Sequence, residues 1–319
     1  MASSGTTLFN PAVVFIITSA YRKLGVINED ENPSAGMMSD ALFALNSLTK
    51  EWMATGIHVW TEEEAILFLQ PNQARYLIGG TTTAVTSDAN NWNLLTLASS
   101  AALSSTTITL VSATGVIDNQ PIGIILDDGT TQWTTVDGTP VGNVVTLATA
   151  LTASASSGNY VFTYTTKIFR PLKVPSARRF GYNGRIETPM RVFSRREYMD
   201  LPNKTNPGLP TAFFYSPSLV SGELYVWPVP MNSSFGIRFT WYRPLQDFND
   251  PNDTSDLPAE WINALTWNLA VELAPDFSIP APRFAILKSQ AAEKLELAEG
   301  WDREAQPIFF GVSFEEGRY

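Results

Sequence analysis

Residues 257–276, with the sequence LPAEWINALTWNLAVELAPD, decide how the rest of the chain can fold. Pro258 predicts a helix start, because proline in the first turn lacks only an N–H that has no helical partner there. Pro275 predicts the end of the helix. No glycine lies between these two prolines, so the segment predicts a helix of about four to five turns.

This predicted helix has two apolar faces. At about 100° per residue, one face consists of Ile262, Leu265, Leu269 and Leu273, and the nearly opposite face of Ala264, Trp267, Val271 and Ala274. A helix that is apolar on two faces needs two packing partners. One partner is the rest of its own domain. The other is either a further layer of the same chain or a neighbouring subunit, for which Ala264, Trp267 and Val271 are the candidate contacts.

Further helices are predicted at both ends of the chain. Asn10-Pro11 has the form of a helix opening, and apolar residues then recur at helical spacing up to Gly25. A second helix is predicted over residues 34–55, and Pro282 opens another with apolar residues at three-to-four spacing. Two helices at each end indicate that the four come together as a helical bundle, with the middle of the chain inserted into it.

The middle of the chain predicts β-structure. Short alternating runs over residues 92–166 are separated by turn dipeptides at roughly 8–12-residue spacing, which is typical of a small antiparallel sandwich or barrel. The fold class predicted is therefore α+β. A helical bundle forms from residues 1–60 and 250–306, and a β-rich middle from 61–91 and 167–249. A small self-contained β module covers 92–166 and a tail covers 307–319.

Composition excludes several classes of protein. Of the 319 residues, 44% are hydrophobic and 16% charged, which indicates a folded chain. The formal net charge of −10 argues against coating of nucleic acid by the whole surface. The absence of cysteine excludes disulfides and cysteine-ligated zinc. No apolar run approaches the ~18 residues of a membrane span, and the apolar run at residues 13–17 lacks the flanks of a signal peptide.

No enzyme motif is recognisable, and we expect no catalytic residue, cofactor or metal ion. His58 is the only histidine, and a lone histidine is more often structural than catalytic. No phosphate-binding loop, dinucleotide fingerprint or nucleophile elbow is present. Glu62, Glu63 and Glu64 form a charge run that is expected to face solvent, although a carboxylate pair distant in sequence stays open. Asp127-Asp128-Gly129 predicts a hairpin turn in preference to a calcium site.

Residues 167–204 concentrate the positive charge. They hold ten of the chain's 21 basic residues against Glu187, Glu197 and Asp200, a local balance of +7. Three interpretations stay open: pairing with the acidic remainder of the same chain, contact with an acidic partner or subunit, or the lining of a path for nucleic acid. The candidate contacts for DNA or an acidic partner are Arg178, Arg179, Arg185, Arg195 and Arg196.

The last residues, PIFFGVSFEEGRY, carry aromatic side chains beyond the last predicted helix. This tail either folds back on its own bundle or inserts into a groove, or adds as a strand, on a partner protein. In the second case its anchors are Phe309, Phe310, Phe314 and Tyr319.

Both ends of the chain also resemble a known family. The stretches AYRKLGV (residues 20–26), ALFALNSLTKEWMATGI (41–57) and LPAEWINALTWNLAVELAPDF (257–277) resemble the tail accessory factors, or head-to-tail adaptors, of short-tailed bacteriophages. The resemblance covers roughly the 120 residues of the helical ends. The large β-rich middle departs from the most compact members of that family.

The resemblance implies a non-enzymatic structural protein of the virion, made in the host cytoplasm. Such proteins dock as a ring, usually of twelve copies, beneath the portal protein at the head-tail junction, and extend a channel through which double-stranded DNA passes unread. The implied partners are the portal, other copies of the chain, the tail nozzle or hub, and tail fibre proteins. Extended C-termini hold the portal in this family, so the resemblance implies that the aromatic tail of this chain binds the portal.

A second hypothesis, from another class, is a polysaccharide-binding or -degrading phage protein that uses the β module. Trp92, Trp133 and Tyr160 are its stacking candidates. An exposed aromatic row on one sheet face favours this hypothesis, whereas burial of the three rings counts against it.

Overall fold

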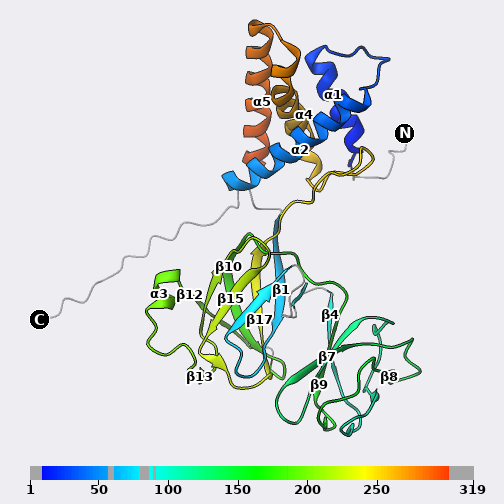
Figure 1. The fold of residues 1–319 in the computed structure, drawn as a ribbon, viewed down its shortest axis with the longest axis vertical. Helices are drawn as coiled ribbons and strands as arrows, with labels where there is room; N and C mark the ends of the chain where they lie inside the picture. The colour runs from blue at the N-terminus through cyan, green and yellow to red at the C-terminus, as the bar shows by residue number, and fades with distance from the viewer. Residues whose placement is uncertain (1–8, 57–60, 80–85, 89–90, 185, 302–319) are drawn as a thin grey trace, which may run out of the picture. The chain divides into compact units, whose positions relative to one another are not determined.

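The computed structural model describes residues 9–56, 61–79, 86–88, 91–184 and 186–301. The chain combines helices with many antiparallel strands, which confirms the predicted α+β class (Figure 1). It divides into two compact units. We call residues 1–60 with 245–319 the helical unit, and residues 61–244 the β unit.

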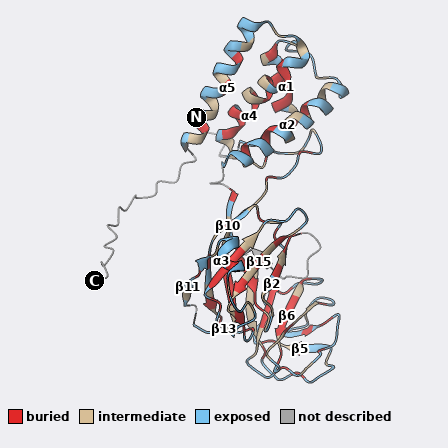
Figure 2. Ribbon diagram, turned by 60° about the vertical axis from the view of Figure 1, so that its left-hand side comes forward, coloured by how far each residue is buried: buried red, intermediate tan, exposed pale blue. Residues whose placement is uncertain are grey.

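The helical unit is organised around the predicted central helix. Its described residues form α1 (Val13–Leu24), α2 (Ala35–Thr55), α4 (Ile262–Leu273) and α5 (Ala281–Trp301). Two short 3₁₀ turns, η2 (Ala259–Trp261) and η3 (Ala274–Phe277), flank α4. The helices α1, α2 and α5 all pack against α4. In both ribbon views α1 and α5 lie on different sides of α4 (Figure 1, Figure 2).

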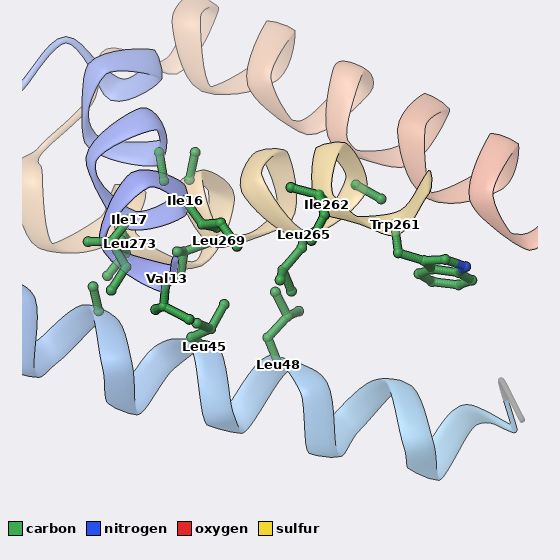
Figure 3. Packing of buried hydrophobic residues seen from close by; sticks show 14 of the residues in the cluster. Val13, Ile16, Ile17, Leu45, Leu48, Trp261, Ile262, Leu265, Leu269 and Leu273 are labelled. Atoms are coloured by element: carbon green, nitrogen blue, oxygen red, sulfur yellow. The ribbon is translucent and has the colours of Figure 1, made fainter. Parts of the chain in front are cut away.

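One hydrophobic core joins these helices (Figure 3). The first apolar face of α4 is buried in that core as predicted, since Leu265 and Leu269 are 0% exposed and Ile262 and Leu273 at most 6%. The same core contains Leu45 and Leu48 of α2 and the apolar stripe of α1. The central segment therefore acts as the common packing partner of the helices around it.

Two details of the predicted helices are wrong. The helix does not open at Asn10-Pro11, because residues 251–255 hold this stretch: Val13 N–H donates to Asp253 O (2.8 Å), and the Asn10 amide donates to Ser255 O (3.1 Å). Helix α1 instead starts at Val13. The α-helix of segment 257–276 also does not begin directly after Pro258, because residues 259–261 form the 3₁₀ turn η2 and α4 starts only at Ile262. The predicted end is confirmed, since α-helical bonding stops before Pro275, which lacks the N–H needed to continue it.

The β unit contains two sheets that pack together. A five-stranded sheet has the order β11-β10-β17-β1-β3, and a four-stranded sheet the order β12-β14-β15-β2. The bounds of the first are β1 (Glu62–Phe68), β3 (Thr86–Asp88), β10 (Lys173–Gly181), β11 (Glu187–Pro189) and β17 (Phe235–Tyr242). Those of the second are β2 (Arg75–Ile78), β12 (Arg191–Val192), β14 (Ala212–Ser216) and β15 (Gly222–Trp227). Leu67, Ile237 and Phe239 from one sheet share a buried cluster with Phe213, Leu224 and Val226 from the other.

Most strand pairs are antiparallel, but two short pairs are parallel, β12 with β14 and β13 (Pro207–Gly208) with β16 (Val229–Pro230). A short helix, α3 (Arg195–Met199), follows β12 and begins with a capping box in which Ser194 and Glu197 bond each other's backbone. Across the described residues, no helix has both the length and the apolar character that crossing a bilayer requires.

Residues 92–164 form two further antiparallel sheets. One has the order β4-β9-β6-β7, and the other pairs β5 with β8. The strands are β4 (Trp92–Thr96), β5 (Thr107–Thr109), β6 (Pro121–Ile125), β7 (Thr131–Thr135), β8 (Val144–Thr146) and β9 (Tyr160–Tyr164). The predicted turn at Asp127-Asp128-Gly129 is confirmed: it joins β6 to β7, with Gly129 in the left-handed region at φ 84° and Leu126 N–H donating to Thr130 O.

This segment has its own core but is not self-contained. Phe162 and Tyr164 of β9 are buried in an aromatic cluster with Phe68 of β1, Phe180 of β10 and Tyr182, which follows β10. The Phe162 ring lies 4.8 Å from that of Phe68 and 4.6 Å from that of Tyr182. The prediction that the segment stands alone is therefore wrong, because removing it would expose the face of β1 that carries Phe68.

Candidate partner-binding surfaces

The described residues offer surfaces for partners and no metal-binding cluster. Within them, no group of three or more His, Cys, Asp or Glu side chains could hold a metal ion. His58 lies outside the described residues. The candidate residues from the sequence therefore have to be judged as surface contacts.

The second face of α4 is divided between the interior and the surface. Ala264 is 1% exposed and Ala274 2%. The Asn268 amide, one turn along from Ala264, donates both to Ala264 O (2.9 Å) and to Ala291 O of α5 (3.2 Å). Helix α5 is thus the intrachain partner of this face. Ala264 is buried within its own chain, and the prediction that it contacts another subunit directly is wrong.

Trp267 and Val271 pack against the helical core and keep part of their surface in solvent. The Lys23 Nζ atom of α1 lies 4.4 Å from the centroid of the Trp267 ring, a cation–π contact. Burial of the lysine lowers its pKa. These two residues remain the accessible part of the predicted interface, with Lys23 beside them.

A groove runs between α1 and the start of α4. Its volume is about 360 Å³, and its lining includes Phe9, Phe15, Ile16, Lys23, Ile262 and Asn263. Phe9 and Phe15 are 65% and 68% exposed. Single exposed apolar side chains are ordinary, whereas several that line one groove are a feature of protein–protein interaction sites. We call this feature the α1–α4 groove.

The groove was missed from the sequence, although one signal for it was present. Phe15 is an apolar residue outside the α1 stripe of Val13, Ile16 and Ile17, and such a residue faces away from the core. Phe9 precedes the helix and has no periodic signal. The sequence could indicate one wall of the groove, but not the second wall from a segment about 250 residues further along the chain.

The candidate arginines have partners within the β unit. The Arg179 guanidinium donates to Pro210 O (2.9 Å) and lies over the Phe235 ring, at 5.7 Å from its centroid. Arg178 lies 3.8 Å from a Glu187 carboxylate oxygen, on the side of the sheet where Arg238 pairs with the other oxygen at 2.8 Å. The Arg238–Glu187 pair was not found from sequence, because its members are about 50 residues apart.

The two arginines of α3 are also engaged. Arg195 donates to Ser216 Oγ (3.3 Å), and Arg196 lies 3.7 Å from Asp200. The Arg196 side chain is 93% exposed, so this ion pair is weak. Arg185 lies outside the described residues. The contacts favour the interpretation in which the basic segment pairs with the same chain, although Arg178, Arg195 and Arg196 all stay exposed to solvent.

The three stacking candidates for a polysaccharide do not form an exposed aromatic row. Trp92 and Trp133 each pack on Phe68, with ring centroids 5.9 and 5.2 Å away, and Tyr160 packs on Tyr182 at 5.8 Å. All three are partly buried against the aromatic cluster described above. This packing counts against the polysaccharide hypothesis.

The aromatic tail residues Phe309, Phe310, Phe314 and Tyr319 lie outside the described residues. Their predicted role as anchors is therefore untested by the structure.

The surfaces described above are candidate contacts with partners, and comparison with known proteins gives the class to which the chain belongs. The family model described as "SU10 adaptor protein" matches residues 125–307. This match covers more than half of the chain, which therefore belongs to the SU10 adaptor protein family. Membership identifies a bacteriophage adaptor and a virion component, and it indicates a structural, non-enzymatic role.

The family match begins inside the 92–166 segment and continues through the β-rich middle into α5. The idea that this middle departs from the family is thus not supported over residues 125–249. No curated protein matches the chain. Among solved structures, VP17, a capsid protein of bacteriophage P23-77, is 10% identical, with 60% of this chain and 77% of that chain covered. Its TM-score of 0.12 is too low to support any conclusion.

Proposed function

We propose that this protein is the head-to-tail adaptor of a short-tailed bacteriophage, a connector ring that docks on the portal, extends the DNA channel and joins the tail nozzle or hub. The observation that supports this most directly is the adaptor family match over residues 125–307. The ring contains about twelve copies, as the resemblance of the helical ends implies. The chain is made in the host cytoplasm and is then incorporated at the head-tail junction.

The charge distribution fits a channel through which DNA moves without being held. The chain carries a formal net charge of −10, and its described candidate arginines have partners of their own. Each basic side chain that engaged a phosphate would release counterions and strengthen binding. A wall with few free cations binds the duplex weakly, which suits passage during packaging and ejection.

The C-terminal tail is proposed to anchor the ring to the portal. Phe309, Phe310, Phe314 and Tyr319 are four large rings within 13 residues at the end of the chain. Insertion of aromatic side chains into a groove contributes strongly to binding, because each ring removes a large apolar surface from water. Free subunits are expected to be monomers that form the ring only on the portal.

Electron microscopy of the purified chain mixed with isolated portal rings tests this proposal. We expect a ring of this protein at one end of the portal, coaxial with its channel. Portal rings without added density contradict the docking, and a stable ring formed without portal contradicts the monomer expectation.

A chain truncated after Gln306 separates the role of the tail from that of the ring. We expect this variant to keep the helical circular-dichroism signal of the full chain and to lose docking. The matched control is Phe43→Ala, which removes a 78% exposed aromatic ring from α2 and is expected to dock normally. Normal docking of the truncated chain contradicts the anchor role while leaving the adaptor role intact.

A further inference from the structure

We propose that neighbouring copies contact each other heterologously, with the α1–α4 groove of one copy receiving the exposed stripe of α5 of the next. This inference rests on the proposed ring. It specifies which two surfaces meet in that ring, and it makes the second copy of this chain the occupant of the groove.

The exposed stripe of α5 consists of Ile286, Glu293, Glu296 and Leu297. Ile286 is 65% and Leu297 57% exposed. They are 11 residues apart, about three helical turns, so they lie on the same side of the helix and about 16 Å apart along it. The core side of α5 is formed by other residues, Leu287, Ala291 and Ala298. The two aliphatic side chains of the stripe therefore lie in solvent, outside the core of the helical unit.

The groove and the stripe are complementary in charge as well as in polarity. The aromatic walls of the groove, Phe9 and Phe15, lie near the start of α1, and Arg22 and Lys23 lie in its last turn. The stripe places two exposed carboxylates, Glu293 and Glu296, among its aliphatic residues. In the proposed contact, the aliphatic side chains of the stripe pack against the phenylalanine rings, and its carboxylates lie against the two cations. The charge pairs also determine the register in which the two surfaces meet.

The positions of the two surfaces suit a closed ring. A ring requires a contact between two different surfaces of the same subunit, whereas a contact between identical surfaces gives only a dimer. The groove is formed by α1 with α4, and α5 lies on a different side of α4 from α1 (Figure 2). The helical unit thus presents an aromatic, basic surface on one flank and an aliphatic, acidic stripe on another.

The absence of cysteine from the chain allows this pairing to be tested by disulfide trapping. The variant Phe15→Cys with Leu297→Cys places one thiol on each surface. Particles assembled with this variant as the only source of the chain are oxidised, and the products are separated without reducing agent. We expect a ladder of dimers, trimers and higher species, because each copy joins two neighbours.

The matched control is Phe43→Cys with Leu297→Cys, in which the first thiol stands at an exposed phenylalanine of α2 outside both surfaces. We expect the trapped fraction of the test variant to exceed that of the control by about tenfold, since a specific contact raises the local thiol concentration far above that of random collision. Each single variant alone is expected to give no ladder. An intramolecular disulfide within single chains, or trapped fractions equal in test and control, overturns the pairing.

Charge reversal gives an independent readout. Glu296→Arg is expected to lower trapping by placing a cation against Arg22 and Lys23, and adding Arg22→Glu is expected to restore it. If the double reversal traps no better than the single one, the proposed register is wrong. Particles that lack the chain altogether contradict the proposed adaptor function, a result distinct from particles that contain the chain but show no ladder.

Discussion

Replacing Leu269 by alanine is the sharpest test of the view that α4 holds the helical unit together. Leu269 is 0% exposed in the middle of α4, and three other helices pack around that helix. Because the neighbours come from all these helices, they cannot all move in to fill the space left by the side chain. The expected loss is therefore about 3–4 kcal/mol, within the range of buried leucine-to-alanine changes.

The assay is urea unfolding of the full chain, followed by circular dichroism at the helical band. Almost all α-helix of the described residues belongs to the helical unit, since α3 has only 5 residues. With a slope of about 2 kcal/mol per molar urea, the midpoint of this transition is expected to fall by about 1.5–2 M. Phe43→Ala, at a 78% exposed site on α2, is the control and is expected to change stability by less than about 0.5 kcal/mol.

A loss below about 1 kcal/mol for Leu269→Ala would refute the reasoning, because the core around α4 would then have to be loosely packed or readily rearranged.

Three further predictions concern single residues, two in the β unit and one in the helical unit. A Cβ atom at Gly123 would lie 2.7 Å from the Trp133 ring, so Gly123→Ala is expected to cost about 1–3 kcal/mol in thermal or urea unfolding. Gly36→Ala has open space in α2, with Ser34 Oγ at 4.0 Å the nearest atom, and is expected to stabilise the helical unit by about 0.5–1 kcal/mol. The two substitutions are thus expected to change the free energy of unfolding in opposite directions, and changes of the same sign would contradict the description of these sites. The pKa of Asp127 is lowered by hydrogen bonds from Ser154 Oγ, at 2.8 Å, and then from Ser156 N–H. Because the folded pKa of Asp127 lies below the unfolded one, the carboxylate contributes stability that is present above the unfolded pKa and is lost as pH falls through the folded pKa. Asp127→Asn is therefore expected to flatten the decline of the melting temperature in that acidic window. An unchanged decline would contradict this.

The helical unit was the more predictable part because its signals are local. Periodicity identified Leu265 and Leu269 as buried, and the glycine at position 25 marked the end of the first helix, where the structure has it in the left-handed conformation. The predicted start of α1 was wrong for a physical reason, since the backbone at residues 12–14 is held by residues 251–254. No local pattern near residue 12 could reveal a partner about 240 residues away.

In the β unit the sequence indicated strands and turns but not which strands pair. The antiparallel pair β1–β17 joins residues about 180 apart, and the parallel pair β12–β14 has no sequence signature of its own. The same limit explains the basic segment. Its excess positive charge left pairing within the chain, an acidic partner and nucleic acid all open, and the sequence did not reveal that Arg238, outside that segment, shares Glu187 with Arg178. Charge counted along the chain does not give charge pairing in space.

On the second face of α4, the small side chains are buried within the chain and the larger ones stay partly in solvent. The small side chains of Ala264 and Ala274 are buried, and Asn268 bonds to the backbone of both α4 and α5. The larger side chains of Trp267 and Val271 pack against the same core and keep part of their surface in solvent. Lys23 then covers the tryptophan ring from α1 with a side chain whose charge is partly desolvated. An aromatic ring held beside a cation at the edge of a core is a rigid, amphipathic contact, and this fits the proposed role of α4 in the contact between copies.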